Sequence, residues 1–362
     1  MKKLIWTLVI LVVVGVFGGR AWYLHKQSVA EKDVVKIGVL VPLTGPTARD
    51  GADSLSGMKI AINEINQNPE FGFKLDLLVE DNKLSAPPSL SAFHKINGQV
   101  SAFIVAGTPP ILTLLPVLNK PALSMLNSED EAVYTSTEVF RAWFRVKEQA
   151  EFISNYVKNN YKDSRIAFLK IKAIEGDTFE KILKMKLKDI GQELVANETF
   201  GIGDLETKNQ VVKILDKKPD IIVVYGYAQG YVAALNSLLE QGYKGTIITN
   251  HDVQMNHKHI ANNASGIYFG TADYDFTKIA KNNPDLADNL FAAFGYESVK
   301  ILANVIRENG KDSKKIHDGL INLRDFKTDF GNISYDEKGE MHTLKFVIKQ
   351  MQPDGTAKVI KE

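Results

Sequence analysis

Hydrophobic and polar positions along the first half of the chain follow two alternating periodicities. A β-branched run at 34–41 precedes a segment in which Leu55, Met58, Ile62 and Ile65 recur at helical spacing. Further runs typical of strands lie at 73–80, 102–106, 122–126 and 139–144. The pattern predicts strands separated by amphipathic helices, which is the arrangement of repeated βαβ units.

A second series of the same kind begins near Val146. Its predicted strands cover 165–170, 193–200, 220–225, 246–250 and 266–270, with helices between them. After predicted helices at 290–309 and 313–320, the rhythm changes to short strands at 332–335, 343–349 and 357–361. Two series with short connections predict two Rossmann-like α/β lobes, each with a mainly parallel sheet covered by helices on both faces.

The N-terminus has the pattern of an export signal. Lys2 and Lys3 precede an uncharged, mostly apolar run over 4–19. The apolar stretch extends over 4–24 with a single charge, which is long enough to cross a bilayer. Residues 1–32 are therefore either a cleaved signal peptide or a hydrophobic helix retained as an anchor in the inner membrane. Both place the rest of the chain in the periplasm or another extracytoplasmic space, because the two lysines favour an inside N-terminus.

Composition excludes several classes of function. The 362 residues are 44% hydrophobic and 24% charged with a net charge of +1, as in an ordinary two-domain globular protein. No basic patch stands out, so there is no electrostatic case for nucleic acid. The absence of cysteine excludes disulfides, thiolate catalysis and Cys-based metal sites. No glycine-rich phosphate-binding or dinucleotide-binding motif is complete, and we expect no cofactor.

Four segments carry a family pattern in the right order. They are IGVLVPLTGP at 37–46, GMKIAINEIN at 57–66, EDN at 80–82 and FGNISYDEKG at 330–339. Together they resemble the periplasmic leucine/isoleucine/valine-binding proteins, which have the type I periplasmic binding protein fold of ABC importers, over about residues 34 to 362. The resemblance implies three interlobe crossings, near Arg145, Thr271 and Asp329. The first lobe would then comprise 33–145 and 272–329, and the second lobe 146–271 and 330–362.

The resemblance also implies a ligand between the lobes. Loops at the carboxyl ends of strands are where open α/β sheets bind ligands. The candidate ligand-binding residues that the resemblance gives are Asp50, Thr108, Asn127, Ser128, Glu175, Tyr227 and Asp252. Thr108 is at the same time the expected N-cap of the next helix, because Pro109 and Pro110 suit a first helical turn. In the family this loop offers hydroxyls and amides to a ligand carboxylate, but two prolines supply no N–H.

Other positions depart from the family pattern. Asp50 and Glu175 stand where the family has an aromatic side chain, and Glu129 and Asp130 replace neutral residues, facing either solvent or the cleft. Since the fold pattern is kept while the amino-acid site is altered, we expect leucine, isoleucine and valine to bind poorly. A neutral, polar or cationic solute fits these residues better.

The second lobe keeps two features of the family site. Tyr227 matches a family tyrosine, and Asp252 lies near the position at which the family places an acid for the ligand ammonium, with His251 one residue away. His251 also belongs to a local cluster with His257 and His259. A solvated polar loop is the preferred interpretation of this cluster, and no metal site is predicted.

Two functions from different classes remain. One is a solute-binding module that delivers a small polar, amino-acid-like or other molecule to the membrane subunits of an ABC permease. The other is a membrane-tethered sensor or adaptor that uses the same fold without transport, which a retained anchor over 4–24 would favour. An enzyme is not expected, because nothing in the sequence places two of Glu129, Asp130 and Glu175 at a catalytic separation.

Overall fold

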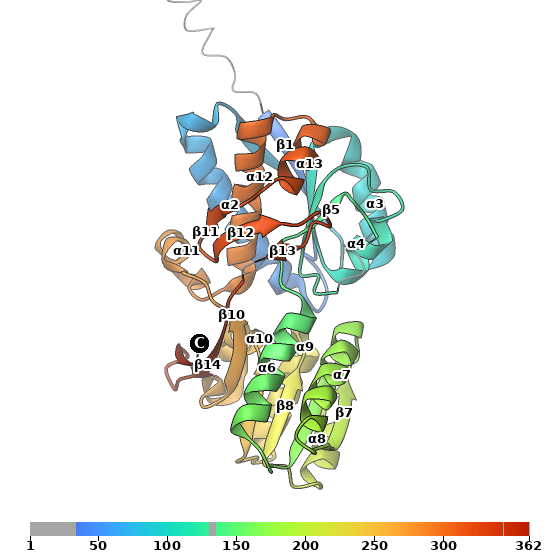
Figure 1. Cartoon of the computed structure of the whole chain (residues 1–362), viewed down its shortest axis with the longest axis vertical. Coiled ribbons are helices and arrows are strands. Elements are labelled where there is room, and N and C mark those ends of the chain that lie inside the picture. Colours follow the sequence, from blue (N-terminus) through green and yellow to red (C-terminus); the bar gives the residue numbers. More distant parts are fainter. Residues whose placement is uncertain (1–33, 130–134, 343, 362) are drawn as a thin grey trace, which may run out of the picture.

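Residues 34–129, 135–342 and 344–361 are described by a computed structural model, in which two α/β lobes are stacked along the long axis of the molecule (Figure 1). The predicted apolar segment at 4–24 lies outside the described residues. Among the helices of the described part, none combines the length and the apolar character needed to cross a membrane.

The first lobe is built on a five-stranded sheet. In spatial order its strands are β2 (Lys74–Asp81), β1 (Val34–Val41), β3 (Ala102–Ala106), β4 (Ala122–Met125) and β5 (Val139–Arg141). All neighbouring pairs are parallel, as expected for apolar strands covered on both faces. The helices of one face are α2 (Ala48–Gln67) and α12 (Leu290–Asn309), and those of the other are α3 (Ala86–Ile96) and α4 (Thr108–Leu114).

Helices α2 and α12 cross so closely that two glycines are required at the crossing. A Cβ atom on Gly57 would lie 1.9 Å from the carbonyl oxygen of Ala292, and one on Gly295 would lie 2.2 Å from that of Ser54. No larger residue fits such a distance. The first turn of each helix reaches the cleft between the lobes, where both contribute to the cavity described below.

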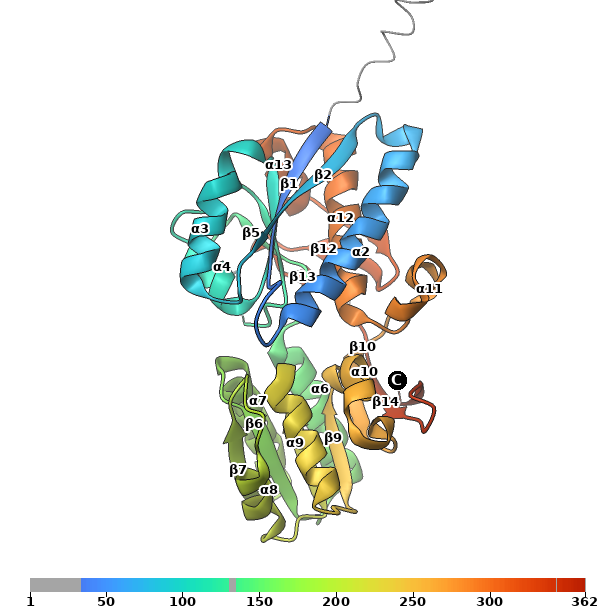
Figure 2. The ribbon, with the colours of Figure 1, turned by 180° about the vertical axis from the view of Figure 1, so that it is seen from behind.

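The second lobe is built on a seven-stranded mixed sheet. In spatial order its strands are β15 (Ala357–Lys361), β14 (Phe346–Met351), β10 (Tyr268–Ala272), β9 (Thr246–Asn250), β8 (Ile221–Tyr225), β6 (Ile166–Ile171) and β7 (Leu194–Phe200). The five strands from β10 to β7 are parallel, whereas β14 and β15 are antiparallel. Helices α6 (Val146–Asn160) and α7 (Ile174–Lys188) pack together on one face (Figure 1), and α8 (Lys208–Leu215) and α9 (Ala228–Glu240) lie on the other (Figure 2).

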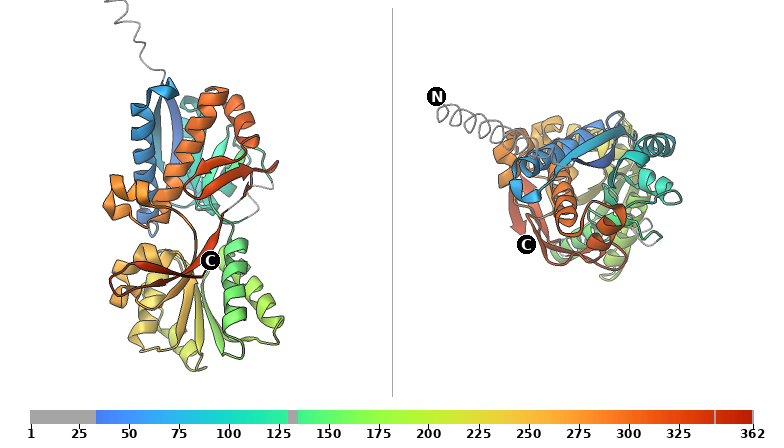
Figure 3. Two further views of the ribbon diagram at one scale, coloured as in Figure 1. Left: turned by 60° about the vertical axis from the view of Figure 1, so that its left-hand side comes forward. Right: turned by 90° about the horizontal axis from the view of Figure 1, so that it is seen from above.

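The chain passes between the lobes three times, as expected, but the third crossing is not where the resemblance placed it. The first two crossings follow β5 and β10, after which the chain enters α6 and α11 (Thr277–Asn282). The third comes after β13 (Met341–His342), immediately before β14, and the strand that enters the second lobe is visible at the waist in Figure 3.

The predicted crossing near Asp329 is therefore wrong, and residues 330–342 belong to the first lobe. Strands β11 (Phe326–Thr328), β12 (Gly331–Tyr335) and β13 form a small antiparallel sheet. Phe330, Ile333, Tyr335 and Met341 pack into the hydrophobic core of the first lobe. The sequence predicts β12, expected at 332–335, but neither β11 nor β13, and it does not tell which of the two apolar cores this segment covers.

Candidate ligand-binding cleft

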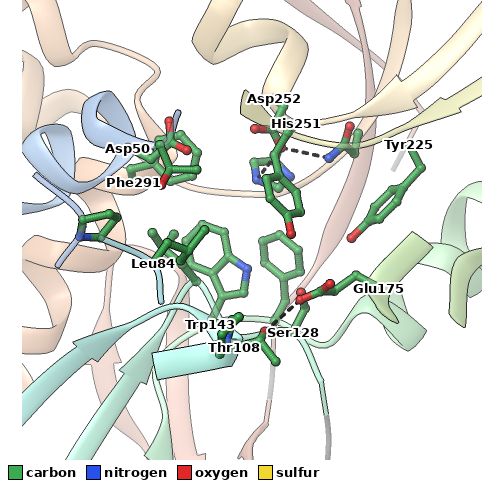
Figure 4. Close-up of a pocket in the computed structure, with 17 residues that line it drawn as sticks. Asp50, Leu84, Thr108, Ser128, Trp143, Glu175, Tyr225, His251, Asp252 and Phe291 are labelled. Atoms are coloured by element: carbon green, nitrogen blue, oxygen red, sulfur yellow. Dashed lines mark hydrogen bonds and ion pairs between the residues drawn. The ribbon is translucent and has the colours of Figure 1, made fainter. Parts of the chain in front are cut away.

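A cavity of about 600 Å³, including its open mouth, lies between the lobes at the carboxyl ends of strands from both sheets (Figure 4). The first lobe lines it with Pro42, Thr47, Asp50, Leu84, Thr108, Pro109, Leu126, Ser128, Trp143, Phe144 and Phe291. The second lobe lines it with Glu175, Tyr225, Tyr227, Asn250, His251 and Asp252. Six of the seven predicted residues thus reach one cavity, and Asn127 is the exception.

Aromatic rings form much of the first-lobe wall. Trp143 and Phe144 follow β5 directly, and Phe291 lies in the first turn of α12. The rings of Trp143 and Phe291 are nearly parallel, with centroids 5.9 Å apart. None of the three residues is among those predicted from the sequence. The predicted strand at 139–144 covers the first two, and no rule about strand ends points to the start of α12.

Thr108 does not cap its helix. Gly107 occupies the N-cap position of α4 with a φ of 103°, and Thr108 is the first helical residue. Its hydroxyl lies 2.8 Å from Oε1 of Glu175 and 3.1 Å from Oδ1 of Asn127. One hydroxyl proton serves one acceptor at a time, and the shorter distance and the negative charge favour Glu175. Since Glu175 lies on α7, this hydrogen bond joins the two lobes across the cleft.

Arg141 holds the loop that carries the predicted residues Asn127 and Ser128. Its guanidinium donates to the backbone oxygens of Asn127 and of Glu129, and it pairs with Glu340. Asn127 is fully buried behind the cavity wall, with its Oδ1 3.1 Å from the hydroxyl of Thr108. Ser128 lines the cavity itself.

Of the two acids next in sequence, only Glu129 belongs to the described residues. Oε1 of Glu129 lies 3.4 Å from the hydroxyl of Thr178 on α7, in a separate depression beside the cleft. Asp130 lies outside the described residues. Glu175 and Glu129 thus accept hydrogen bonds from the hydroxyls of two different threonines, Thr108 and Thr178.

Asp252 is the most deeply buried acid of the cavity. Its Oδ2 accepts a hydrogen bond of 2.8 Å from Asn250 and lies 3.3 Å from Nε2 of His251. Its Oδ1 has no hydrogen-bond partner among the described residues. Burial, and after it the charge of Asp50, raises the pKa of Asp252 well above its usual range.

His251 is neutral in this network. Gln149 donates from Nε2 to the carbonyl of Gly270 at 3.0 Å, and the same nitrogen lies 3.2 Å from Nδ1 of His251. This amide orientation makes Nδ1 an acceptor and leaves the proton on Nε2, which faces Asp252. Burial lowers the pKa of His251 to about 3.

The expectation of a solvated loop around His251 was therefore wrong. The segment forms a short buried helix, α10 (Asp252–Asn256), that fills the space between β9 and the first lobe. Met255 from this helix packs into the first-lobe core. Only His259 is fully exposed, with His257 half-buried, and no cluster of potential metal ligands occurs within the described residues.

Asp50 lies in the first turn of α2 and opens onto the same cavity. Burial raises its pKa to about 7, the neighbouring Asp53 adds to the increase, and Arg49 opposes it. Among the described residues that line the cavity there is no lysine and no arginine. The cavity therefore combines three acids with aromatic and apolar walls.

Comparison with known proteins agrees with this architecture. A family model described as periplasmic binding protein matches residues 34–356. A Leu/Ile/Val-binding protein homolog of Brucella suis is 24% identical, with 99% of this chain and 98% of the relative covered. Among solved structures, a branched-chain amino acid transporter substrate-binding protein of Streptococcus pneumoniae in complex with isoleucine superimposes with a TM-score of 0.80, at 22% identity over 91% of this chain and all of the other. A solute-binding protein of Rhodopseudomonas palustris in complex with 3,4-dihydroxybenzoic acid gives a TM-score of 0.82, at 17% identity over 91% and 96% of the two chains.

These similarities support the type I fold and a solute-binding role, because members of this family are solute-binding proteins and not enzymes. They also imply a location in the periplasm or its extracytoplasmic equivalent. The chain belongs to the periplasmic binding protein family.

Proposed function

We propose that this protein captures a small polar solute between its two lobes and delivers it to the membrane subunits of an ABC permease. The observation that carries the proposal is the cavity whose walls come from both lobes, with the Thr108–Glu175 hydrogen bond across it. A ligand that contacts both walls stabilises the closed arrangement, because it binds that arrangement better than an open one. A permease that recognises the closed form then receives loaded protein in preference to empty protein.

The relatives named for leucine, isoleucine and valine do not carry their ligand over to this chain. The carboxylate of such an amino acid requires donors or a cation, and the first turn of α4 contains Pro109 and Pro110, which have no N–H. The acids Asp50, Glu175 and Asp252 line the same cavity. Like charges in a site that is poorly screened repel more strongly than in water. We therefore expect weak or no binding of the three branched-chain amino acids.

Two measurements test the function. A thermal-shift screen of the full chain against a broad metabolite set should identify a solute that raises the melting temperature, because a ligand that binds only the native state stabilises it. Calorimetry with leucine, isoleucine and valine should give no binding, and micromolar or tighter binding of any of them contradicts the altered site. Deletion of the gene should then abolish uptake of the solute identified. Unchanged uptake would instead favour a sensor or adaptor.

A further inference from the structure

Among the described residues, the carboxyl groups around the cavity have no lysine or arginine beside them in its lining. Asp50 reaches it from the first lobe, and Glu175 and Asp252 reach it from the second. Figure 4 shows these three carboxylates at separate points around the space. The nearby guanidinium of Arg141 is bound to Glu340 and to the loop carbonyls, and it does not line the cavity. Within the described residues, the cavity lining therefore contains three carboxyl groups and no lysine or arginine. Burial raises the pKa of Asp50 and of Asp252, so their ionised forms are disfavoured in the empty cavity and a bound cation would favour them.

One of these groups has an unused acceptor. Asp252 is 2% exposed, and its Oδ1 accepts no hydrogen bond from any described residue. His251 is neutral and donates toward the other oxygen, so it does not compensate the charge. A buried carboxylate oxygen without a partner costs free energy in the empty protein. A ligand that donates a charged hydrogen bond to this oxygen removes that cost.

Aromatic rings complete the site. Trp143, Phe144, Phe291, Tyr225 and Tyr227 all line the cavity. The face of an aromatic ring attracts a cation electrostatically, most strongly where water is excluded. Rings of this kind also pack against the apolar carbons attached to an ammonium nitrogen. Acids together with aromatic faces therefore suit an organic cation better than a neutral polar molecule, which would leave the carboxylates uncompensated.

We propose, on the basis of the solute-binding function above, that the ligand is a small organic cation with an amine or quaternary ammonium group and no carboxylate. Its charge lies between Asp50 of the first lobe and Glu175 and Asp252 of the second. Attraction to acids on both walls then favours closure, because opening separates the cation from one of them.

Calorimetry of the full chain with two sets of matched compounds tests the ligand class. The first set is choline, its neutral isostere 3,3-dimethylbutan-1-ol, and glycine betaine, which adds a carboxylate. The second is benzylamine, benzyl alcohol and benzoate. In at least one set, the ammonium compound is expected to bind at least about tenfold more tightly than its neutral and carboxylate counterparts, as the loss of one charge-assisted hydrogen bond implies.

Variants locate the charge. Glu175→Gln and Asp252→Asn keep the side-chain shape and should each weaken binding of the ammonium compound by roughly 10- to 150-fold. Glu193→Gln removes an exposed carboxylate of the same lobe outside the cavity and should leave the affinity unchanged. Melting temperatures of all variants establish that they fold. If Asp252→Asn does not fold, Glu175→Gln alone tests whether a cavity carboxylate binds the ammonium compound.

The outcomes separate the ligand class from the function. Equal or tighter binding of a neutral or carboxylate compound, or no binding of either ammonium compound, overturns the cation class. If the broad thermal-shift screen then still yields a solute, the solute-binding function stands. If no solute of any class binds, the proposed function is contradicted as well.

Discussion

Two buried clusters of charge, one in the core of the first lobe and one in the cleft, are satisfied to very different degrees. Arg141 and Glu340 are 1% and 2% exposed, and their side chains form hydrogen bonds of 2.8 and 3.1 Å. Asp252 is equally buried at 2%, yet one of its oxygens has no partner among the described residues. A buried polar atom that lacks a partner destabilises a protein, so folding alone does not account for this arrangement. The difference agrees with the proposal that the cleft acids bind a ligand.

The two clusters are also connected. The guanidinium of Arg141, already paired with Glu340, donates to the carbonyls of Asn127 and Glu129. These carbonyls flank Ser128, which lines the cavity. The pair of Arg141 with Glu340 thus fixes the loop that brings Ser128 to the cavity wall. The variants below separate the structural role of this pair from the role of the acids in the cleft.

The largest effect on stability is expected when the pair of Arg141 with Glu340 is broken. Arg141→Met leaves Glu340 buried without its cation and should lower the free energy of unfolding by about 3–5 kcal/mol. Urea denaturation measures the change. The matched control is Lys314→Met, which removes one partner of an exposed pair with Asp318 and should have no measurable effect. Equal effects of the two substitutions would contradict the structural importance of the buried pair.

In the cleft, removing a carboxylate at Asp50 is expected to increase the free energy of unfolding rather than lower it. The pKa of Asp50 is raised to about 7 in the folded protein from a usual value of 3.8, so the folded state binds more protons than the unfolded state between these values. The stability of the wild-type protein therefore falls as pH rises from about 4 to about 7. Asp50→Asn removes this loss and should increase the free energy of unfolding at pH 8 by roughly 2–4 kcal/mol.

Denaturation of both proteins across this pH range checks the prediction for Asp50. The gain of the Asp50→Asn variant should shrink toward pH 4, because the folded wild-type carboxyl is then protonated and the unfolded one begins to bind its proton as well. Asp76→Asn, at an exposed carboxylate of β2, should show no such dependence. A gain that does not vary with pH would mean that the charge of Asp50 is not its cause.

A smaller effect is expected at the contact between the lobes. Thr108→Val keeps the shape of the side chain and removes the hydroxyl that donates to Glu175 at 2.8 Å. A hydrogen bond to a charged group contributes about 1.5–3 kcal/mol, so closure should be less favourable and ligand affinity should fall by at least about tenfold. Calorimetry with the ammonium compound that binds measures the change. Thr113→Val, on the exposed side of the same helix, is the control. An unchanged affinity would show that this bond does not contribute to closure.

The fold could be predicted from periodicity because each strand and helix carries its own local pattern. Strand β1 was expected over 34–41 and helix α12 over 290–309, and both have these bounds. The position of the third crossing could not be predicted, because no local pattern tells which of the two cores the predicted strand at 332–335 covers, and β13 was not predicted. Only tertiary contacts such as that of Tyr335 with Phe140, with ring centroids 5.5 Å apart, assign them to the first lobe.

The site was predictable where it follows strand ends and not where it depends on packing. Glu175, Tyr227 and Asp252 were expected at the cavity and line it, although their contact with a ligand stays a prediction. Phe291 was missed because it reaches the cleft only through the close crossing of α12 with α2. A residue's partner across the cleft, such as Glu175 for Thr108, is likewise set by how the two lobes approach each other, which no local pattern encodes.

The smallest effect, no change at all in an NMR titration, is expected at His251. This residue tests most directly whether Asp252 differs from the paired Glu340. A protonated His251 would form an ion pair with Asp252. Asp252 would then have a cationic partner, as Glu340 has in Arg141. The orientation of Gln149 makes Nδ1 an acceptor, and burial lowers the pKa of His251 to about 3. NMR titration of the imidazole resonances, assigned with a His251→Gln variant, should therefore show no shift for His251 between pH 5 and pH 8. A midpoint for His251 near 6.5 would mean that Asp252 already has a cation, and the case for a cationic ligand would then rest on Asp50 and Glu175 alone.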